Sequence, residues 1–295
     1  MANARVLVKR RKSVRNIRKI TRTMQLIATA RFQSAFNQAT ATKPYTEKIS
    51  ELVAKITKHA GEVEHPLLRA NAGAGRSAIL ILTSNRGLCG GYNANVLRVA
   101  MGYINDRKKA DETVDIHIDG KKGTGYLKFL GLPLASQRLS MEDKPRFEDV
   151  EKIAQGFIEQ YARRELDSVH VAYMKFISTG RQRGELMQLL PLAREVEPAD
   201  AATAPADEEG IEYDFSPEPA VLLAELLPAS VKVRLFQCFT DAAVSEQVAR
   251  MIAMKAATDA AGDMIKLLTR QYNRARQTRI TLELLDIVGG AEALT

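Results

Sequence analysis

The sequence predicts an α/β protein in which the N- and C-terminal helices form a long antiparallel coiled coil and the middle forms a Rossmann-like α/β domain. Two observations predict it. Both ends of the 295-residue chain are long helical stretches, and strand and helix patterns alternate between them. We expect an N-terminal helix over residues 1–60, the α/β domain over 76–235 and a C-terminal helix over 241–295.

The N-terminal helix is predicted from apolar and small residues that recur at alternating spacings of three and four. A spacing that averages 3.5 residues is typical of a narrow seam that packs on one other helix. Pro44 lies inside this stretch, and the sequence leaves open whether it kinks the helix or ends it. The seam consists of Val14, Ile17, Thr21, Met24, Ala28, Arg31 and Ala35.

The central region alternates between strand and helix signals. Strands are predicted at residues 78–83, 114–119 and 168–176, and helices at 93–108 and 147–164. This alternation indicates a parallel sheet with helices packed on it. A further strand is expected within residues 186–192.

The C-terminal helix is predicted by an apolar stripe that continues, without a proline after Pro228, to Val288. A helix over residues 241–288 would be about 70 Å long, so we expect it to project from a compact domain. Ala and Gly residues at 253–262 would let the N-terminal helix approach its backbone closely. The alternative, that each end packs separately on the central domain, stays open.

Charge is distributed unevenly along a chain of net charge +8. The first acidic residue is Glu47, and nine basic residues lie within the first 22 positions, whereas residues 195–218 are acidic and rich in Ala and Pro. A basic helix free of acids suits a nucleic-acid arm, a transit peptide or an acidic protein partner. The seam runs through the basic stretch and argues against the first two. The basic residues are Arg5, Lys9, Arg10, Arg11, Lys12, Arg15, Arg18, Lys19 and Arg22.

We expect neither a secretory signal nor a transmembrane helix, because no apolar run approaches eighteen residues. Cys89 and Cys238 are the only cysteines, which excludes a disulfide framework and a cysteine-based zinc site. A reducing interior fits this composition.

No catalytic, cofactor-binding or metal-binding residue is predicted. The glycine-rich turn at residues 84–91 lacks the Lys-Ser/Thr ending of a P-loop and does not fit Gly-x-Gly-x-x-Gly. The second glycine cluster, residues 120–125, is interpreted as a solvated turn. The four histidines show no metal-type pairing, and Cys89 is interpreted as a small buried side chain. Two hypotheses rank behind the one that a family resemblance gives below. The first is a basic coiled-coil protein that binds nucleic acid or acts as a scaffold, and the weaker one is an α/β enzyme that uses the glycine turns.

Three stretches resemble the gamma subunit family of rotary F-type ATP synthases. They are RRKSVRNIRKITRTMQLIATARFQ at residues 10–33, LTSNRGLCGGYNANV at 82–96, and the segment 245–294, which contains YNRARQTRIT and ELLDIVGGAEAL. They occur in the family's order and cover both ends and the centre. The last segment is the most specific, since no general rule of helix formation demands it.

This resemblance implies a central-stalk rotor subunit that has no catalytic activity or cofactor of its own. The paired helices would turn inside a hexamer of three alpha and three beta subunits and couple proton flow through a membrane ring, the c-ring, to ATP synthesis or hydrolysis. An epsilon subunit would be a further partner. The chain would bind no nucleic acid and would not insert directly into the membrane. The expected location is peripheral, on the cytoplasmic face of the bacterial plasma (inner) membrane.

The resemblance also assigns contact residues where the motifs match. The foot stretch departs from the family pattern because Ser216 stands where an acid is common before the first proline, so the contact would involve its neighbours. The beta-subunit contacts would be Met24, Arg250, Arg276, Gln277 and Thr281; the apolar bearing tip Leu284, Leu285, Ile287, Val288 and Leu294; and the ring contact Tyr213, Asp214 and Glu218.

Overall fold

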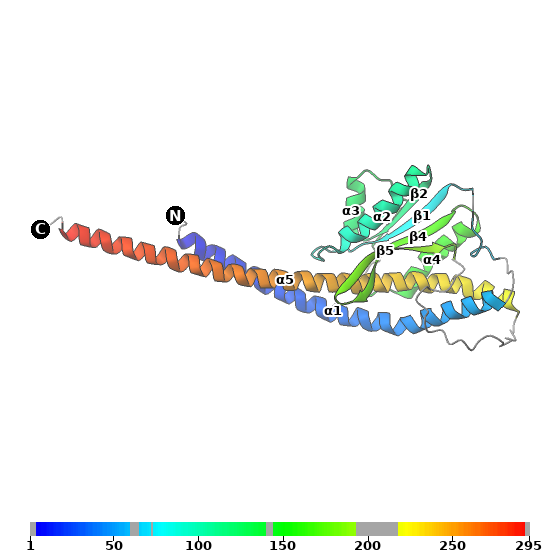
Figure 1. Cartoon of the computed structure of the whole chain (residues 1–295), viewed down its shortest axis with the longest axis horizontal. Coiled ribbons are helices and arrows are strands. Elements are labelled where there is room, and N and C mark those ends of the chain that lie inside the picture. The colour runs from blue at the N-terminus through cyan, green and yellow to red at the C-terminus, as the bar shows by residue number, and fades with distance from the viewer. Residues whose placement is uncertain (1–3, 60–64, 72, 140–143, 193–217, 293–295) are drawn as a thin grey trace. The chain divides into compact units, whose positions relative to one another are not determined.

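The computed structural model describes residues 4–59, 65–71, 73–139, 144–192 and 218–292. The chain divides into two compact units (Figure 1). Unit 1 contains Met1–Ala30 and Arg250–Thr295, and unit 2 contains Arg31–Ala249. The elements in chain order are α1 (Ala4–His59), β1 (Arg76–Leu82), α2 (Tyr92–Lys109), β2 (Thr113–Asp119), α3 (Lys121–Phe129), β3 (Ser136–Arg138), α4 (Phe147–Ala162), β4 (Ser168–Ser178), β5 (Arg181–Leu190) and α5 (Pro219–Glu292).

Unit 2 is built on a five-stranded sheet of order β3-β2-β1-β4-β5. The first four strands pair in parallel, which confirms the predicted parallel layer. The expected further strand is also present, but β5 pairs antiparallel to β4. Only two residues separate the two strands, and so short a connection closes a hairpin and cannot return the chain for a parallel crossover.

The two faces of this sheet bury separate cores. Side chains alternate along β1, so Ile79 and Ile81 pack with α2 and α3, while Leu80 and Leu82 pack with α4, α5 and the end of α1. Phe157 and Phe239 are among the large residues of the second core. Both faces are therefore covered, which explains why β1 is apolar along its length.

Two sequence predictions within unit 2 are wrong. The glycine cluster at residues 120–125 is not a solvated turn, because α3 begins at Lys121 and Gly123 is buried. The C-terminal helix begins at Pro219 and not near residue 241, and it runs through Pro228. Pro219 is well tolerated in the first helical turn, where its missing N–H has no intrahelical partner. Likewise, α1 continues through Pro44 without ending there.

Unit 1 consists of two helical segments, residues 4–30 of α1 and 250–292 of α5, here called the helix pair. They run antiparallel (Figure 1), as Thr21 next to Thr258 and Arg11 over the ring of Tyr272 require. The predicted pairing of the two ends is thus confirmed. The assignment of Ile17 to the seam is wrong, however, because its side chain is 52% exposed.

Candidate functional site: the exposed surface of the helix pair

The helix pair buries a narrow seam and leaves the rest of both helices exposed. On α1 the buried side chains Leu7, Val14, Thr21 and Ala28 recur every seven residues. A heptad repeat keeps one stripe facing the partner helix and turns the other faces outward. On α5 the buried and half-buried side chains alternate at spacings of four and three: Met254, Thr258, Ala261, Ile265, Leu268, Tyr272 and Ala275.

The outward face of α1 in the pair is strongly basic. No acidic residue occurs in its first turn or in the rest of unit 1's part of this helix. Arg11 is half-buried and its guanidinium carbon lies 5.1 Å from the centre of the Tyr272 ring, a cation–π contact. A surface of one charge sign favours an acidic partner. The exposed basic residues are Arg5, Lys9, Arg10, Lys12, Arg15, Arg18, Lys19 and Arg22.

The five predicted shaft contacts form two groups along the pair. Arg276, Gln277 and Thr281 are exposed on α5, and the Thr281 hydroxyl donates to the Gln277 carbonyl oxygen at 3.0 Å. Arg250 lies 26 residues earlier, about 39 Å away along the helix. It is only 7% exposed and is engaged in an interaction within the chain. Met24 is half-buried on α1.

The predicted bearing tip is an uncovered apolar helix end. Leu284, Leu285, Ile287 and Val288 are between 56% and 68% exposed. Every residue at positions 281–289 is exposed, so no described part of the chain covers them. Uncovered apolar side chains at this density are typical of a surface that binds a partner. Leu294 lies outside the described residues.

Of the predicted ring contacts, only Glu218 can be placed. It is exposed, and its backbone carbonyl oxygen accepts hydrogen bonds from the backbone N–H groups of Val221 and Leu222 at 3.0 and 3.2 Å. It is thus fixed at the start of α5. Tyr213 and Asp214 lie outside the described residues.

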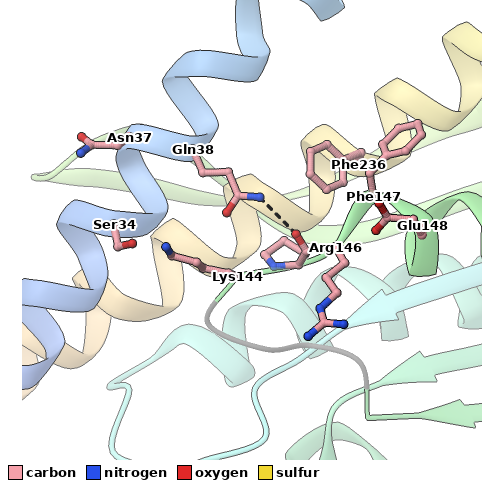
Figure 2. Close-up of a pocket in the computed structure, with 9 residues that line it drawn as sticks. Ser34, Asn37, Gln38, Lys144, Arg146, Phe147, Glu148 and Phe236 are labelled. Carbon is pink, nitrogen blue, oxygen red and sulfur yellow. Dashed lines mark hydrogen bonds between the residues drawn. The ribbon is translucent and has the colours of Figure 1, made fainter.

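Unit 2 contains a groove of about 790 Å³ at the start of α4 (Figure 2). The Gln38 side-chain amide donates to the Pro145 carbonyl oxygen at 3.1 Å, and the rings of Phe147 and Phe236 meet edge to face at 5.4 Å. The groove offers no histidine, cysteine or paired acid for acid–base or nucleophilic chemistry. Its lining residues are Ser34, Asn37, Gln38, Lys144, Pro145, Arg146, Phe147, Glu148 and Phe236.

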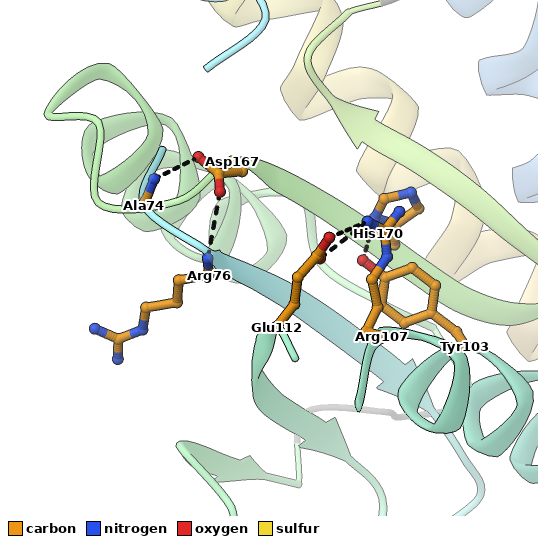
Figure 3. A network of polar contacts seen from close by, with 7 residues as sticks. All are labelled: Ala74, Arg76, Tyr103, Arg107, Glu112, Asp167 and His170. Atoms are coloured by element: carbon orange, nitrogen blue, oxygen red, sulfur yellow. Dashed lines mark hydrogen bonds and ion pairs between the residues drawn. The ribbon is translucent and has the colours of Figure 1, made fainter. Parts of the chain in front are cut away.

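The polar network around His170 is structural (Figure 3). The Tyr103 hydroxyl lies 3.0 Å from His170 Nδ1, and Arg107 forms an ion pair with Glu112 at 2.9 Å. Burial lowers the pKa of His170 to about 4, so the ring is neutral near pH 7. Asp167 accepts hydrogen bonds from the backbone N–H groups of Ala74 and Arg76. These contacts tie α2 and the loop before β1 to the sheet.

The interpretation of Cys89 as a small buried side chain is confirmed. Cys89 is 3% exposed, and the Asn93 side-chain amide lies within hydrogen-bond distance of its Sγ at 3.3 Å and of Ser84 Oγ at 2.8 Å. Within the described ranges, no three histidine, cysteine or acidic side chains gather as a metal site would require. None of the helices there combines the length and apolar character needed to cross a membrane.

Two features of the structure escape sequence reasoning. The Thr21 and Thr258 hydroxyls meet at 2.8 Å inside the helix pair. In unit 2, Asp241 is half-buried, and desolvation raises its pKa to about 6 although Gln237, Lys175 and Lys43 favour the charged form. An acid within an otherwise apolar stretch of α5 is the signal that could have drawn attention to Asp241.

Comparison with known proteins matches the whole chain. The model of a family described as ATP synthase matches residues 3–294. The "ATP synthase gamma chain" of Rhodopirellula baltica is 50% identical over 294 residues, covering 100% of this chain and 99% of the relative. The protein of the same name from Leptospira biflexa is 39% identical over 295 residues, covering 100% of both chains.

Solved structures share the fold. A chain of the Euglena gracilis mitochondrial ATP synthase, in a structure of OSCP, F1 and c-ring in rotational state 3, aligns with a TM-score of 0.67 at 17% identity. The alignment covers 99% of this chain and 94% of that one. A chain of the rotor of the same enzyme, in rotational state 1, aligns with a TM-score of 0.62 at 16% identity and covers 94% and 98%.

Proposed function

We propose a function for this chain from the premise that it belongs to the gamma-chain family of ATP synthases. It is the central-stalk rotor subunit, which couples proton flow to ATP synthesis or hydrolysis by rotating inside the catalytic head. It is a non-catalytic subunit, because catalysis resides in the beta subunits. Its residues therefore act by contact and by transmitting force, not by bond chemistry.

The observation that carries this function is the uncovered surface of the helix pair. Apolar side chains at the end of α5 are more than half exposed, and the outward face of α1 in the helix pair carries only basic charges. Every residue at positions 281–289 is exposed, so no described part of the chain covers the tip. A head that encloses the pair would supply apolar contacts to the tip and acidic contacts to the basic faces.

For the beta-subunit contacts, we assign Arg276, Gln277 and Thr281 to one group and Met24 with Arg250 to another. Arginine carries a planar, permanently charged group that can bind a carboxylate through two hydrogen bonds. Arg276 is exposed, so its guanidinium can bind a carboxylate of a beta subunit without any rearrangement of the helix pair. Arg250 is already buried and has an interaction within the chain. Its contribution is therefore to stabilise the surrounding surface of the helix pair, or to exchange this interaction for one with a beta subunit as the shaft turns.

For the tip, we assign Leu284, Leu285, Ile287 and Val288, with Leu294 beyond them, to an apolar bearing. Apolar contacts are non-directional, so they hold an axle at many angles of rotation at similar free energy. Directional hydrogen bonds at the same place would favour particular angles. An apolar tip therefore suits a surface that must turn.

The remaining partners follow from the same proposal. The complete assembly would hold three alpha and three beta subunits around the shaft, an epsilon subunit, and the membrane c-ring at the foot, where Glu218, Tyr213 and Asp214 would face basic loops. The chain would then be peripheral on the cytoplasmic face of the bacterial inner membrane. Its own residues would not enter the bilayer.

The test is reconstitution with matching alpha and beta subunits. ATP hydrolysis and gel filtration are measured for the mixture and for each component alone. We expect a large complex, with strong hydrolysis only in the mixture. Failure of correctly folded partners to bind the chain, together with a salt-sensitive complex with DNA, would instead favour a nucleic-acid protein.

The contact assignment is tested in the same assembly. Arg276→Ala and Gln277→Ala should each lower ATP-driven proton pumping per ATP hydrolysed, without altering the fold. Arg274→Ala is the matched control, since Arg274 is also an exposed arginine and lies two residues from Arg276, on another side of α5. Equal effects of Arg274→Ala and Arg276→Ala would contradict the assignment.

A further inference from the structure

A polar cluster in unit 2 lies where α5 meets the hairpin formed by β4 and β5. Cys238 Sγ of α5 lies 3.7 Å from Met187 Sδ of β5, and the Ser245 hydroxyl of α5 donates to the Met174 carbonyl oxygen of β4 at 3.1 Å. The half-buried side chain of Asp241 comes between these two contacts, about one helical turn from each. Its carboxyl group is therefore held at the junction of the helix and the hairpin.

The Asp241 carboxyl group has one polar partner among the described residues. The Gln237 side-chain amide donates to Asp241 Oδ1 at 2.9 Å, and no cation of the described chain forms an ion pair with this carboxyl group. The oxygen of the same amide, Gln237 Oε1, is buried and has no hydrogen-bond partner. An ionised carboxylate cannot supply one, because it only accepts hydrogen bonds.

A protonated Asp241 would complete this pair. A carboxylic acid carries one O–H donor, and its other oxygen still accepts. The acid and the amide would then be joined by two hydrogen bonds, one from Gln237 Nε2 to Asp241 Oδ1 and one from the Asp241 hydroxyl to Gln237 Oε1. Desolvation favours the same form, since it raises the pKa of Asp241 to about 6.

The nearby acid Glu185 has two cationic partners, whereas Asp241 has none. Lys175 Nζ of β4 lies 3.0 Å from Glu185 Oε1 of β5, and the Arg183 guanidinium lies 2.8 Å from Glu185 Oε2. Lys175 is on the same side of β4 as Tyr173, which packs in the core that includes α5. Glu185 thus keeps a partner, Arg183, if Lys175 leaves.

Lys175 is the cation best placed to respond to a charge on Asp241. Lys43 of α1 also favours the charged form, but less strongly than Lys175, and it pairs with Glu47 at 3.6 Å in solvent. Ion pairs of exposed side chains contribute little. The ionisable groups around Asp241, with their ion-pair partners, are Cys238 on α5, Tyr173 and Lys175 on β4, Arg183 and Glu185 on β5, and Lys43 and Glu47 on α1.

We propose that Lys175 exchanges Glu185 for Asp241 when Asp241 loses its proton to solvent. The structure shows the arrangement of the protonated form, in which Lys175 joins β4 to β5 and the Gln237 amide is available to the acid. In the ionised form, Lys175 would tie β4 to α5. The exchange is a pH-sensitive switch within unit 2, and it is independent of the rotor function.

The exchange is tested in the full isolated chain by nuclear magnetic resonance. The side-chain carboxyl carbons of aspartate and glutamate are isotopically labelled and followed from about pH 4 to about pH 9, and Asp241→Asn and Glu185→Gln assign the two signals. We expect Asp241 to titrate near pH 6 and the Glu185 signal to show a second step at the same midpoint, as Lys175 leaves. Absence of this second step in the parent would overturn the proposal.

Two variants separate the exchange from a through-space effect of the new charge. Lys175→Met keeps most of the side chain without its charge, so the second step of Glu185 should shrink severalfold and the midpoint of Asp241 should rise by about one pH unit. Lys43→Met is the matched control, because Lys43 also favours ionised Asp241 but comes from α1, and it should retain the step. A full-sized step in Lys175→Met, or its loss in Lys43→Met, would overturn the assignment to Lys175.

Crystal structures at two pH values give the position of Lys175 directly. In the parent, Lys175 Nζ should lie about 3 Å from Glu185 near about pH 5 and about 3 Å from Asp241 near about pH 8. Asp241→Asn retains an N–H donor for Gln237 Oε1 and no charge, so Lys175 should stay on Glu185 at both pH values. A lysine that stays on Glu185 in the parent near about pH 8, or that moves in Asp241→Asn, would overturn the proposal.

Discussion

At the scale of single residues, Gly123 has no room for a side chain. A Cβ built on it would lie 2.6 Å from Ile118 Cδ1 and 2.6 Å from Thr83 Oγ1. The Thr83 hydroxyl also accepts a hydrogen bond from the Gly123 N–H at 3.1 Å. This close approach of α3 to the ends of β1 and β2 explains why a helix starts at a glycine-rich segment whose sequence predicts a turn.

We predict that Gly123→Ala lowers the free energy of unfolding by about 1–3 kcal/mol, because overpacking shifts Thr83 and Ile118. Urea unfolding followed by circular dichroism measures this. Gly125→Ala is the control: nothing lies within 4 Å of its built Cβ, so it should be neutral or stabilise the helix. The explanation fails if the two variants behave alike.

Asp241 gives a second residue-scale prediction, a pH dependence. Burial raises its pKa from 3.8 to about 6, while Lys175 and Lys43 lower it and Glu185 raises it. The raised pKa means that the folded state binds the proton of the Asp241 carboxyl more tightly than the unfolded state does. The contribution of Asp241 to stability is therefore complete below about pH 4 and is lost as the pH rises through about 6.

Asp241→Asn should therefore raise the free energy of unfolding at about pH 7.5 by about 1–2 kcal/mol relative to the parent. The difference between variant and parent should vanish near pH 4. Taking this difference removes the opposite contributions of His117 and His170, whose pKa values burial lowers to about 4. Asp263→Asn, at an exposed position paired with Lys266, should show no such dependence. A difference that does not change with pH would contradict the assignment to Asp241.

At the scale of elements, the sequence predicts those helices and strands whose signal is local. The apolar run of β1 and the alternating strand and helix patterns around it identify the parallel sheet, since burial on both faces leaves a continuous apolar strand. The three-four spacing identifies the pairing of α1 with α5. Each of these patterns can be recognised within a window of about 11–18 residues.

The remaining elements depend on contacts that no local pattern encodes. Helix α3 contains two glycines that weaken any helical signal, and packing on Thr83 and Ile118 overrides them. The start of α5 is hidden by Pro228, whose helical surroundings are held by buried Leu227 and Val231. Ile17 fits the seam by spacing, but its side chain lies on the outer side of α1.

Pro44 tests how far packing supports α1. The helix continues through it although proline provides no N–H for the Thr40 carbonyl. We predict that Pro44→Ala stabilises unit 2 by about 1–3 kcal/mol and slows amide hydrogen exchange in residues 40–48. Lys43→Ala, which removes only an exposed 3.6 Å ion pair with Glu47, should change stability by less than about 0.5 kcal/mol. Faster exchange in Pro44→Ala would mean that the proline is not a weak point of the helix.

At the scale of the whole molecule, the candidate site could be predicted only in part. Gln277 and Thr281 follow from motifs that match a family, and the exposed tip follows from apolar residues at the end of a long helix. The Thr21–Thr258 pair could not be predicted, because its register joins residues 237 positions apart. Likewise, the burial of Arg250 depends on packing that the sequence does not specify.

The tip should matter to the assembly and not to the isolated chain. Ile287, 68% exposed, makes little contact within the chain, so Ile287→Asp should change its stability by less than about 0.5 kcal/mol. Placing a charge in an apolar bearing should instead weaken binding to the alpha and beta subunits, measured by sedimentation. Asn273→Asp is the control, because it also introduces an aspartate at an exposed position of α5. If both variants bind the alpha and beta subunits equally well, the assignment of Ile287 to an apolar bearing is wrong.

The most direct test of the account is to watch this chain turn. A bead attached at Lys109→Cys, an exposed position in unit 2 whose side chain is 77% exposed, is followed by light microscopy in a surface-fixed complex with alpha and beta subunits. The account predicts sustained rotation in one direction that requires ATP. Continued ATP hydrolysis with a bead that stays still, or that moves in both directions equally, would contradict it.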